Sequence, residues 1–161
     1  HPRVNILKPG PGVGGHCIAV DPWFIVSKVP NQSNLIKTAR EVNNDKTEWV
    51  INKIKNEREL FYNNCNKEPI IGCFGLTFKP DVDDIRESSA LKVVKKLLAA
   101  NLNIICCDPM IKDFEGLEIR DIDFLLEKSD ILVFLVSHSK FLNLNYGSSI
   151  VLDFCGISYR R

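Results

Sequence analysis

The second half of the chain alternates short apolar runs with helical patterns, and this alternation limits the possible folds more than any other feature. Apolar runs of strand length occur at 70–74, 103–107, 131–136 and 149–154. Helical patterns at Ser88–Ala100 and Ile122–Lys128 separate the first three runs. Strands that are apolar on both faces and joined through helices are typical of a parallel sheet covered on both sides. We therefore predict an α/β fold, with a Rossmann-like parallel sheet forming a domain over residues 66–161.

Residues 1–65 lack this alternation and are predicted to form a loop followed by a helical arm. Asp21 is expected to cap a short helix that Pro30 ends. A long helix is expected over Asn34–Tyr62, where apolar residues recur at three- and four-residue steps. The polar triplet Asn43-Asn44-Asp45 interrupts that pattern and is expected to bend or split the helix.

Composition and charge exclude several classes of protein. The 161 residues are 45% hydrophobic, enough for a packed core, and their net charge of +1 argues against a nucleic-acid surface. No stretch approaches the ~18–20 apolar residues of a membrane span, and there is no signal peptide. We expect a cytoplasmic protein with no membrane or nucleic-acid partner. The chain opens at HPRVNILKPG without a methionine, so we also expect a fragment of a longer protein.

The cysteines indicate reduced thiols rather than a metal site or a disulfide framework. No C-x-x-C pair is present and three cysteines stand within apolar runs, which argues against zinc and structural disulfides. We expect buried structural thiols, with Cys17 as the exception because its neighbours are glycines. The six are Cys17, Cys65, Cys73, Cys106, Cys107 and Cys155.

Residues 9–23, PGPGVGGHCIAVDPW, form the first candidate site. Glycines allow a backbone to approach a ligand closely, at a cost in chain entropy. Cys17 follows them and precedes the expected helix start, a place that suits a reactive thiol. Asp21 is a candidate for holding water or transferring a proton. The alternative is a tight turn in which Cys17 fills a small gap; a dyad of Cys17 with His16 is disfavoured because adjacent side chains usually point apart.

Residues 74–88, FGLTFKPDVDDIRES, form the second candidate site. They follow the first strand, and ligands of such sheets bind at the carboxyl ends of the strands. Lys79 and Arg86 are candidates for meeting an anionic ligand there. The alternative is a surface loop in which Asp84 and Glu87 form a capping box for the next helix.

The dinucleotide fingerprint G-x-G-x-x-G is absent from this loop, which argues against NAD binding by this domain alone. Asp108, at the end of the second strand, either reaches a ribose or makes a turn. His138, after the third strand, is expected to start a helix or a turn rather than to act in catalysis.

Together these motifs resemble the UDP-glucose/GDP-mannose dehydrogenase family, most closely its bacterial members that act on UDP-N-acetyl-D-mannosamine. The resemblance spans essentially the whole chain. It rests on the stretches HPRVNILKPGPGVGGHCIAVDPWFIV, LIKTAREVNNDK, CFGLTFKPDVDDIRES and SDILVFLVSHSKF.

The resemblance implies a homodimeric, metal-free enzyme that oxidises the C6 alcohol of a nucleotide sugar to a carboxylate with two NAD⁺ and one water. Cys17 matches the nucleophile that forms a thioester, and Asp21 matches the aspartate near the hydrolytic water. The expected role is bacterial surface-polysaccharide or capsule synthesis. Loop residues also match positions that contact the substrate, some of them across a dimer: His1, Arg3, Gly14, Phe78 and Lys79.

Arg86 matches a residue that reaches NAD, which the family binds mainly through an N-terminal domain absent from this sequence. The chain also has Cys155 where the family usually places a lysine or arginine. The expected architecture is thus a UDP-binding domain preceded by a helical arm of the central dimerisation domain, without activity of its own. Alternatives are a UDP-sugar-binding or dimerisation module, a dehydrogenase for another UDP-hexose, and, least favoured, a cysteine hydrolase.

Overall fold

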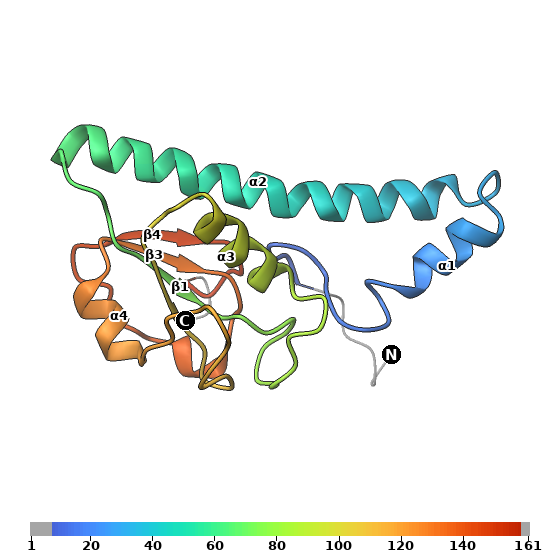
Figure 1. The fold of residues 1–161 in the computed structure, drawn as a ribbon. Coiled ribbons are helices and arrows are strands. Elements are labelled where there is room, and N and C mark those ends of the chain that lie inside the picture. Colours follow the sequence, from blue (N-terminus) through green and yellow to red (C-terminus); the bar gives the residue numbers. More distant parts are fainter. Residues whose placement is uncertain (1–7, 159–161) are drawn as a thin grey trace.

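A computed structural model describes residues 8–158 of the chain (Figure 1). His1 and Arg3 lie outside the described residues. Two helices come first and an alternation of strands and helices follows, as the sequence predicts. The elements are α1 (Asp21–Lys28), α2 (Asn34–Cys65), β1 (Ile71–Phe74), α3 (Ser89–Ala99), β2 (Ile104–Cys107), α4 (Ile122–Lys128), β3 (Ile131–Phe134), a short 3-10 helix η1 (Ser139–Phe141) and β4 (Ile150–Asp153).

The four strands form one all-parallel sheet in the order β2-β1-β3-β4. Each central strand pairs residue by residue with its neighbours; for example, Ile71 of β1 lies between Ile104 of β2 and Ile131 of β3. The chain leaves β1 for β2 on one side and then crosses to β3 on the other. This change of direction puts a crevice at the carboxyl ends of β1 and β3, where open α/β sheets bind their ligands.

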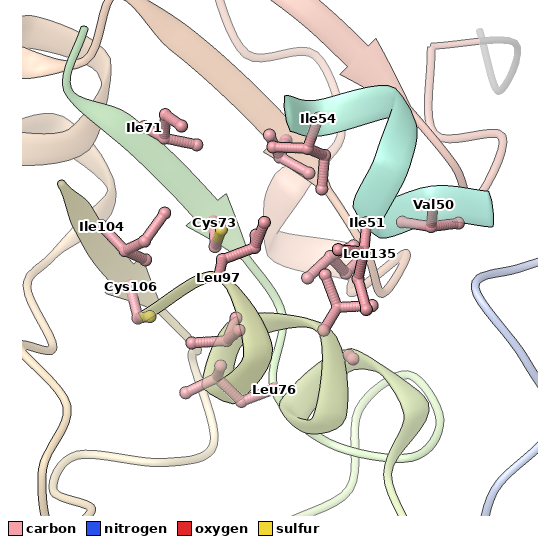
Figure 2. Close-up of a cluster of buried hydrophobic side chains, with 14 of the residues drawn as sticks. Val50, Ile51, Ile54, Ile71, Cys73, Leu76, Leu97, Ile104, Cys106 and Leu135 are labelled. Atoms are coloured by element: carbon pink, nitrogen blue, oxygen red, sulfur yellow. The ribbon is translucent and has the colours of Figure 1, made fainter. Parts of the chain in front are cut away.

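Apolar side chains on both faces of the sheet hold the layers together. On one face, Ile71 and Cys73 pack with α3 and with Ile51 and Ile54 of α2 (Figure 2). On the other, Phe74 stacks on Phe134, with ring centroids 4.6 Å apart, in a cluster that includes α4. Burial of both faces explains why the strands are apolar at successive positions and not at alternate ones.

Helix α2 is continuous over 32 residues, so the prediction of a bend or break at Asn43-Asn44-Asp45 is wrong. Asn43 faces the N-terminal loop and binds its backbone, which gives this polar side chain a partner without disturbing the helix. The helix ends where Asn66 adopts a left-handed conformation, φ 48°, and donates its N–H to the Tyr62 carbonyl.

Two predictions of helix capping are also wrong. The N-cap of α1 is Val20, and Asp21 is the first helical residue, followed by Pro22. The N-cap of α3 is Ser88, whose hydroxyl accepts a hydrogen bond from the Leu91 N–H. Asp84 does not form the expected capping box because its carboxylate binds the Arg86 side chain instead.

None of the helices within residues 8–158 has the length and apolar character needed to cross a lipid bilayer.

Candidate active site

The two candidate loops meet at the carboxyl ends of β1 and β3, around a cavity of about 580 Å³. The glycine-rich loop lines it from Lys8 to Gly14, and the loop after β1 lines it from Thr77 to Pro80. The segment after β3 and Cys155 complete the wall. The volume lies within the range of small-molecule sites. The topology of the sheet thus brings two segments that are roughly 65 positions apart in the sequence to the same site.

The glycine-rich loop packs so closely on the second loop that side chains would not fit between them. A β-carbon on Gly14 would lie 2.3 Å from the Glu87 carbonyl oxygen. Gly15, at φ +90°, lies against the Phe78 ring and donates its N–H to the Arg86 carbonyl over 3.2 Å. The glycines are therefore required by the contact between the loops.

Two polar side chains of α2 hold the other side of this loop. Asn43 accepts a hydrogen bond from the Val13 N–H (2.7 Å) and donates one to the Val13 carbonyl (3.3 Å). Thr47, one helical turn later, donates its hydroxyl to the Pro11 carbonyl over 2.9 Å. The loop is thus fixed between α2 and the segment 78–87, and Asn43 and Thr47 are site-forming residues that sequence reasoning missed. Their four-residue spacing on one helix face was the available signal.

Cys17 is exposed, in the turn that leads into α1, and is not itself among the residues that line the cavity. Its carbonyl accepts hydrogen bonds from the N–H groups of Val20 and Asp21. The next residue, Ile18, lines the cavity. Cys65, at the far end of α2, is also exposed, so Cys17 is not the single exception among the thiols.

The four remaining cysteines are buried in the two cores. Burial raises the pKa of Cys106 and of Cys107 to about 12 and raises that of Cys73 well above its usual value. These side chains stay protonated and shielded near neutral pH, so they act as core residues.

Charged groups surround the Cys17 turn. The carboxylate of Asp84 binds the Arg86 guanidinium through two nitrogens, and His16 lies 3.8 Å from the same carboxylate. Hydrogen bonds from Arg86 lower the pKa of Asp84 to about 2. The pKa of Arg86 is raised, first by its hydrogen bonds to Asp84 and to a smaller extent by the charge of Cys17. The Arg86 backbone is bound to the glycine-rich loop through Gly15, two residues before Cys17.

Three of the eight predicted site residues line the cavity; His1 and Arg3 lie outside the described residues, and Cys17, Asp21 and Arg86 are not part of the lining. Gly14, Phe78 and Lys79 line the cavity, and the Lys79 ammonium lies 5.5 Å from the centre of the Phe78 ring. Arg86 is beside the Cys17 turn. Asp21 is exposed at the start of α1 and is not among the residues that line the cavity.

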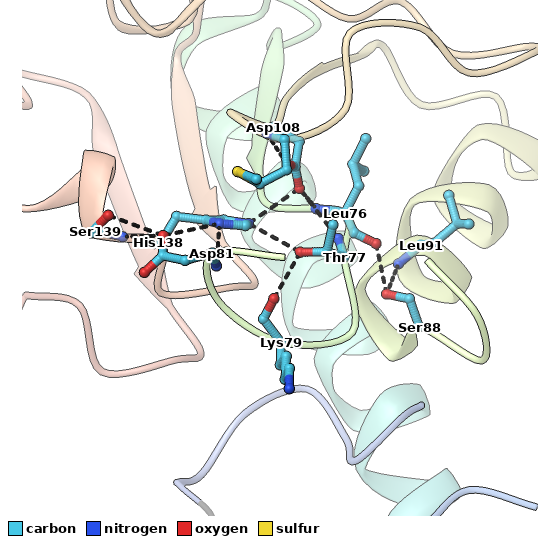
Figure 3. Close-up of polar contacts among 10 residues, drawn as sticks. Leu76, Thr77, Lys79, Asp81, Ser88, Leu91, Asp108, His138 and Ser139 are labelled. Carbon is cyan, nitrogen blue, oxygen red and sulfur yellow. Dashed lines mark hydrogen bonds and ion pairs between the residues drawn. The ribbon is translucent and has the colours of Figure 1, made fainter. Parts of the chain in front are cut away.

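Asp108 makes a turn by accepting a hydrogen bond from the Met110 N–H, and His138 precedes η1 as its N-cap, as predicted; their contact with each other was not predicted (Figure 3). The Asp108 carboxylate accepts hydrogen bonds from the N–H groups of Leu76 and Thr77 and lies 3.2 Å from His138 Nε2. Both side chains are fully buried. Burial alone would raise the pKa of Asp108, but hydrogen bonds from His138, Leu76 and Met110 outweigh it, and the pKa is lowered.

Residues 8–158 lack two usual features of a dinucleotide site. Asp108 stands where such domains hold a ribose, but its carboxylate is occupied by Leu76, Thr77 and His138. The loop after β1 contains only Gly75 of the fingerprint glycines. Within the same residues, no group of three or more His, Cys, Asp or Glu side chains is arranged to hold a metal ion.

A parallel sheet with helices on both faces, and with its cavity at the strand-order reversal, defines a Rossmann-like nucleotide-binding domain. Comparison with known proteins specifies the family. The model of the UDP-binding domain of the UDP-glucose/GDP-mannose dehydrogenase family matches residues 72–157, and that of its central domain matches residues 1–45. The chain belongs to the UDP-glucose/GDP-mannose dehydrogenase family.

Similar proteins carry the names of nucleotide-sugar dehydrogenases. The NDP-N-acetyl-D-galactosaminuronic acid dehydrogenase of Ralstonia solanacearum is 46% identical over 98% of this chain and 38% of its own length. The UDP-N-acetyl-D-mannosamine dehydrogenase of Escherichia coli K12 is 47% identical over 90% of this chain and 37% of its own. The solved UDP-N-acetyl-mannosamine dehydrogenase of S. aureus superposes with a TM-score of 0.72 at 33% identity, over 98% of this chain and 41% of that one. This chain therefore spans well under half the length of its relatives.

Proposed function

We propose that this chain is the C-terminal portion of an NAD-dependent nucleotide-sugar 6-dehydrogenase, with UDP-N-acetyl-D-mannosamine as its substrate. One observation carries the proposal: the Cys17 loop and the Phe78–Lys79 loop meet around one cavity at the ligand-binding edge of the sheet. An exposed thiol three residues beyond Gly14 of the cavity lining, and the Lys79 ammonium in the wall, suit a substrate with a reactive sugar carbon and a diphosphate.

In the proposed reaction, Cys17 acts on the aldehyde that the first oxidation of the C6 alcohol produces. Its thiolate sulfur adds to the aldehyde carbon, forming a C–S bond and an oxyanion. Loss of hydride from that carbon gives a thioester. Water then attacks the thioester carbonyl, the C–S bond breaks, and the products are a carboxylate and the regenerated thiol. We assign Asp21 the orientation of this water because it lies one helical turn beyond Cys17.

NAD would accept the hydride in both oxidations. Since residues 8–158 lack two usual features of a dinucleotide site, we propose that NAD is held mainly by a part of the enzyme outside these 161 residues, with Arg86 reaching it from this side. The 161-residue chain should then bind the nucleotide sugar and catalyse no oxidation.

Binding of the UDP group is assigned to Phe78 and Lys79, with Gly14 allowing the sugar to approach the thiol; His1 and Arg3 are proposed as further contacts. Replacing Lys79 by alanine should weaken UDP binding about tenfold, because a charge-assisted hydrogen bond to phosphate is lost. Isothermal calorimetry with UDP measures this. The matched control is Lys128→Ala, which removes an exposed lysine of α4 paired with Glu127. Equal UDP affinity in both variants would contradict the assignment.

The first alternative is a different hexosamine. The Ralstonia relative is named for a galactosaminuronic acid and the Escherichia relative for mannosamine, at almost equal identity. N-Acetylmannosamine and N-acetylgalactosamine are each a single-centre epimer of N-acetylglucosamine, at C2 and C4 respectively, and a panel of UDP-hexosamines assayed with the longer protein distinguishes them. The second alternative, a UDP-sugar-binding module without catalysis, is disfavoured for the longer protein by the exposed thiol of Cys17 in the loop that borders the cavity.

We propose that the protein forms a homodimer through α1 and the N-terminal half of α2, which extend past the sheet in Figure 1. None of the α1 residues is buried, and Phe24 (66%) and Leu35 (82%) are largely exposed. Apolar surface gathered in this way is typical of an interface. The variant Phe24→Glu should be monomeric at micromolar concentration by light scattering. Met110→Glu, which alters an exposed apolar residue after β2, should remain dimeric. A monomeric unmodified protein would refute this arrangement.

A further inference from the structure

The loop that carries Phe78 and Lys79 is attached to the rest of the domain by Asp108 and His138, which do not line the cavity and have no part in the proposed chemistry. Three of its backbone groups are bound at one end: Leu76 and Thr77 donate N–H groups to Asp108, and the Lys79 carbonyl accepts from the Thr77 hydroxyl over 3.0 Å. At the other end, Asp81 donates its N–H to His138 Nδ1 over 3.0 Å. The loop is therefore held on both sides of Lys79.

These hydrogen bonds determine which nitrogen of His138 carries the proton. Nδ1 accepts from the Asp81 N–H, so it has no proton of its own. Thr77 uses its only hydroxyl proton on the Lys79 carbonyl, so its oxygen accepts from His138 Nε2 over 3.1 Å. The Nε2–H therefore faces two acceptors, Thr77 Oγ1 and Asp108 Oδ2. The imidazole is neutral with its proton on Nε2.

Asp81 has an uncommon backbone conformation that neighbouring residues hold in place. Its φ is +58°, in the left-handed region that L-residues adopt less readily than the right-handed one. Ser139, next to His138, donates both its N–H and its hydroxyl to the Asp81 carboxylate, at 2.9 and 3.0 Å. The segment 138–139 after β3 thus holds both the backbone and the side chain of Asp81 (Figure 3).

We infer that His138, oriented by Asp108, is a positioning residue that fixes the loop 77–81 in the conformation presenting Phe78 and Lys79 to the cavity. Its consequence for ligand affinity rests on the proposed UDP-binding function. The charged groups that face the imidazole are Asp108 at 3.2 Å and Asp81 at 3.7 Å, and the Phe141 ring packs edge-on against it. The side chain is completely buried, so it acts through the loop without touching the ligand.

The test compares His138→Gln with Ile131→Ala. Glutamine keeps a polar end that reaches toward Asp108 but has no acceptor at the place of Nδ1. Ile131 is a fully buried core residue at the opposite end of β3 from the loop, so its truncation lowers stability without touching the loop. Melting temperatures of both variants confirm that each is folded at the temperature of measurement.

The protein has three histidines, and the NMR signal of His138 is the one missing from the spectrum of His138→Gln. In the unmodified protein, long-range ¹H–¹⁵N spectra should show that this histidine is the Nε2–H tautomer. The Asp81 amide should exchange at least about tenfold faster in His138→Gln than in Ile131→Ala, and UDP should bind about tenfold more weakly. An Nδ1–H tautomer, or unchanged Asp81 exchange, overturns the inference. Unchanged UDP affinity in His138→Gln overturns it as well. If the unmodified protein does not bind UDP, the proposed function fails, while the tautomer and the exchange rates still decide the role of His138.

Discussion

Replacement of Cys17 by serine in the longer dehydrogenase is expected to lower formation of the sugar carboxylate by at least about 10³-fold. Serine keeps the size and the turn geometry, but its hydroxyl is a far weaker nucleophile than a thiolate, so the thioester cannot form at a useful rate. The variant should still oxidise the alcohol to the aldehyde but should oxidise the aldehyde further only slowly. Product analysis with an aldehyde trap, together with the ratio of NADH formed to sugar consumed, measures both effects.

The chain offers a matched control for this experiment. Cys65 is the other exposed thiol among residues 8–158, and it lies at the opposite end of α2 from α1 (Figure 1). Cys65→Ser should leave turnover within about twofold, since it alters no group near the cavity. Undiminished carboxylate formation by the Cys17→Ser protein would rule out the thioester route and favour a purely binding role for the loop.

Replacement of Gly14 by alanine should reduce activity of the longer enzyme about 10²-fold, although only one methyl group is added. That methyl would lie 2.3 Å from the Glu87 carbonyl oxygen and 3.2 Å from Phe78 Cβ. Contacts of this kind require about 3.3 Å, so the two loops must separate by about 1 Å. A displacement of that size between a nucleophile and its substrate is enough for such a loss.

Gly10→Ala separates this steric effect from a general effect on the loop. A β-carbon on Gly10 would meet nothing within 4 Å, and the substitution lies in the same glycine-rich segment. We expect a loss of less than about threefold from Gly10→Ala. Steady-state kinetics of both variants, with melting temperatures as a check of folding, gives the comparison. Similar losses in the two variants would mean that the close approach of the loops is not what the glycine provides.

The sheet and its helices could be predicted from the sequence because their signals are local. Every strand lies within its predicted apolar run, and α4 has the predicted bounds, since buried strands and amphipathic helices leave contiguous patterns. The exception is instructive: Ser88 caps α3, where the spacing of Asp84 and Glu87 favoured a capping box. Arg86, two residues after Asp84, binds the Asp84 carboxylate, so that carboxylate does not cap the helix.

The polar framework of the site could not be predicted, because its partners are distant in sequence. Asn43 binds Val13, Thr47 binds Pro11, and His138 binds Asp108, across 30, 36 and 30 positions respectively. Taken alone, each is a polar residue in a helix or after a strand, with many equally plausible partners. The functional roles of Cys17 and Asp21 rest on the family resemblance and stay predictions until the variants are measured.

The length of α2 has a mechanical consequence for the enzyme. Its 32 residues span about 48 Å, and it is anchored to the core through Val50, Ile51 and Ile54 while its first turns carry α1. The N-terminal arm of α2, from Asn34 to Val50, is about 24 Å long, so a tilt of ~5° about Val50 would displace its first turn by ~2 Å. Asn43 and Thr47 sit along this arm and grip the glycine-rich loop. In the dimer proposed above, docking at the tip of α2 and the placement of the loop that contains Cys17 would therefore depend on the same helix.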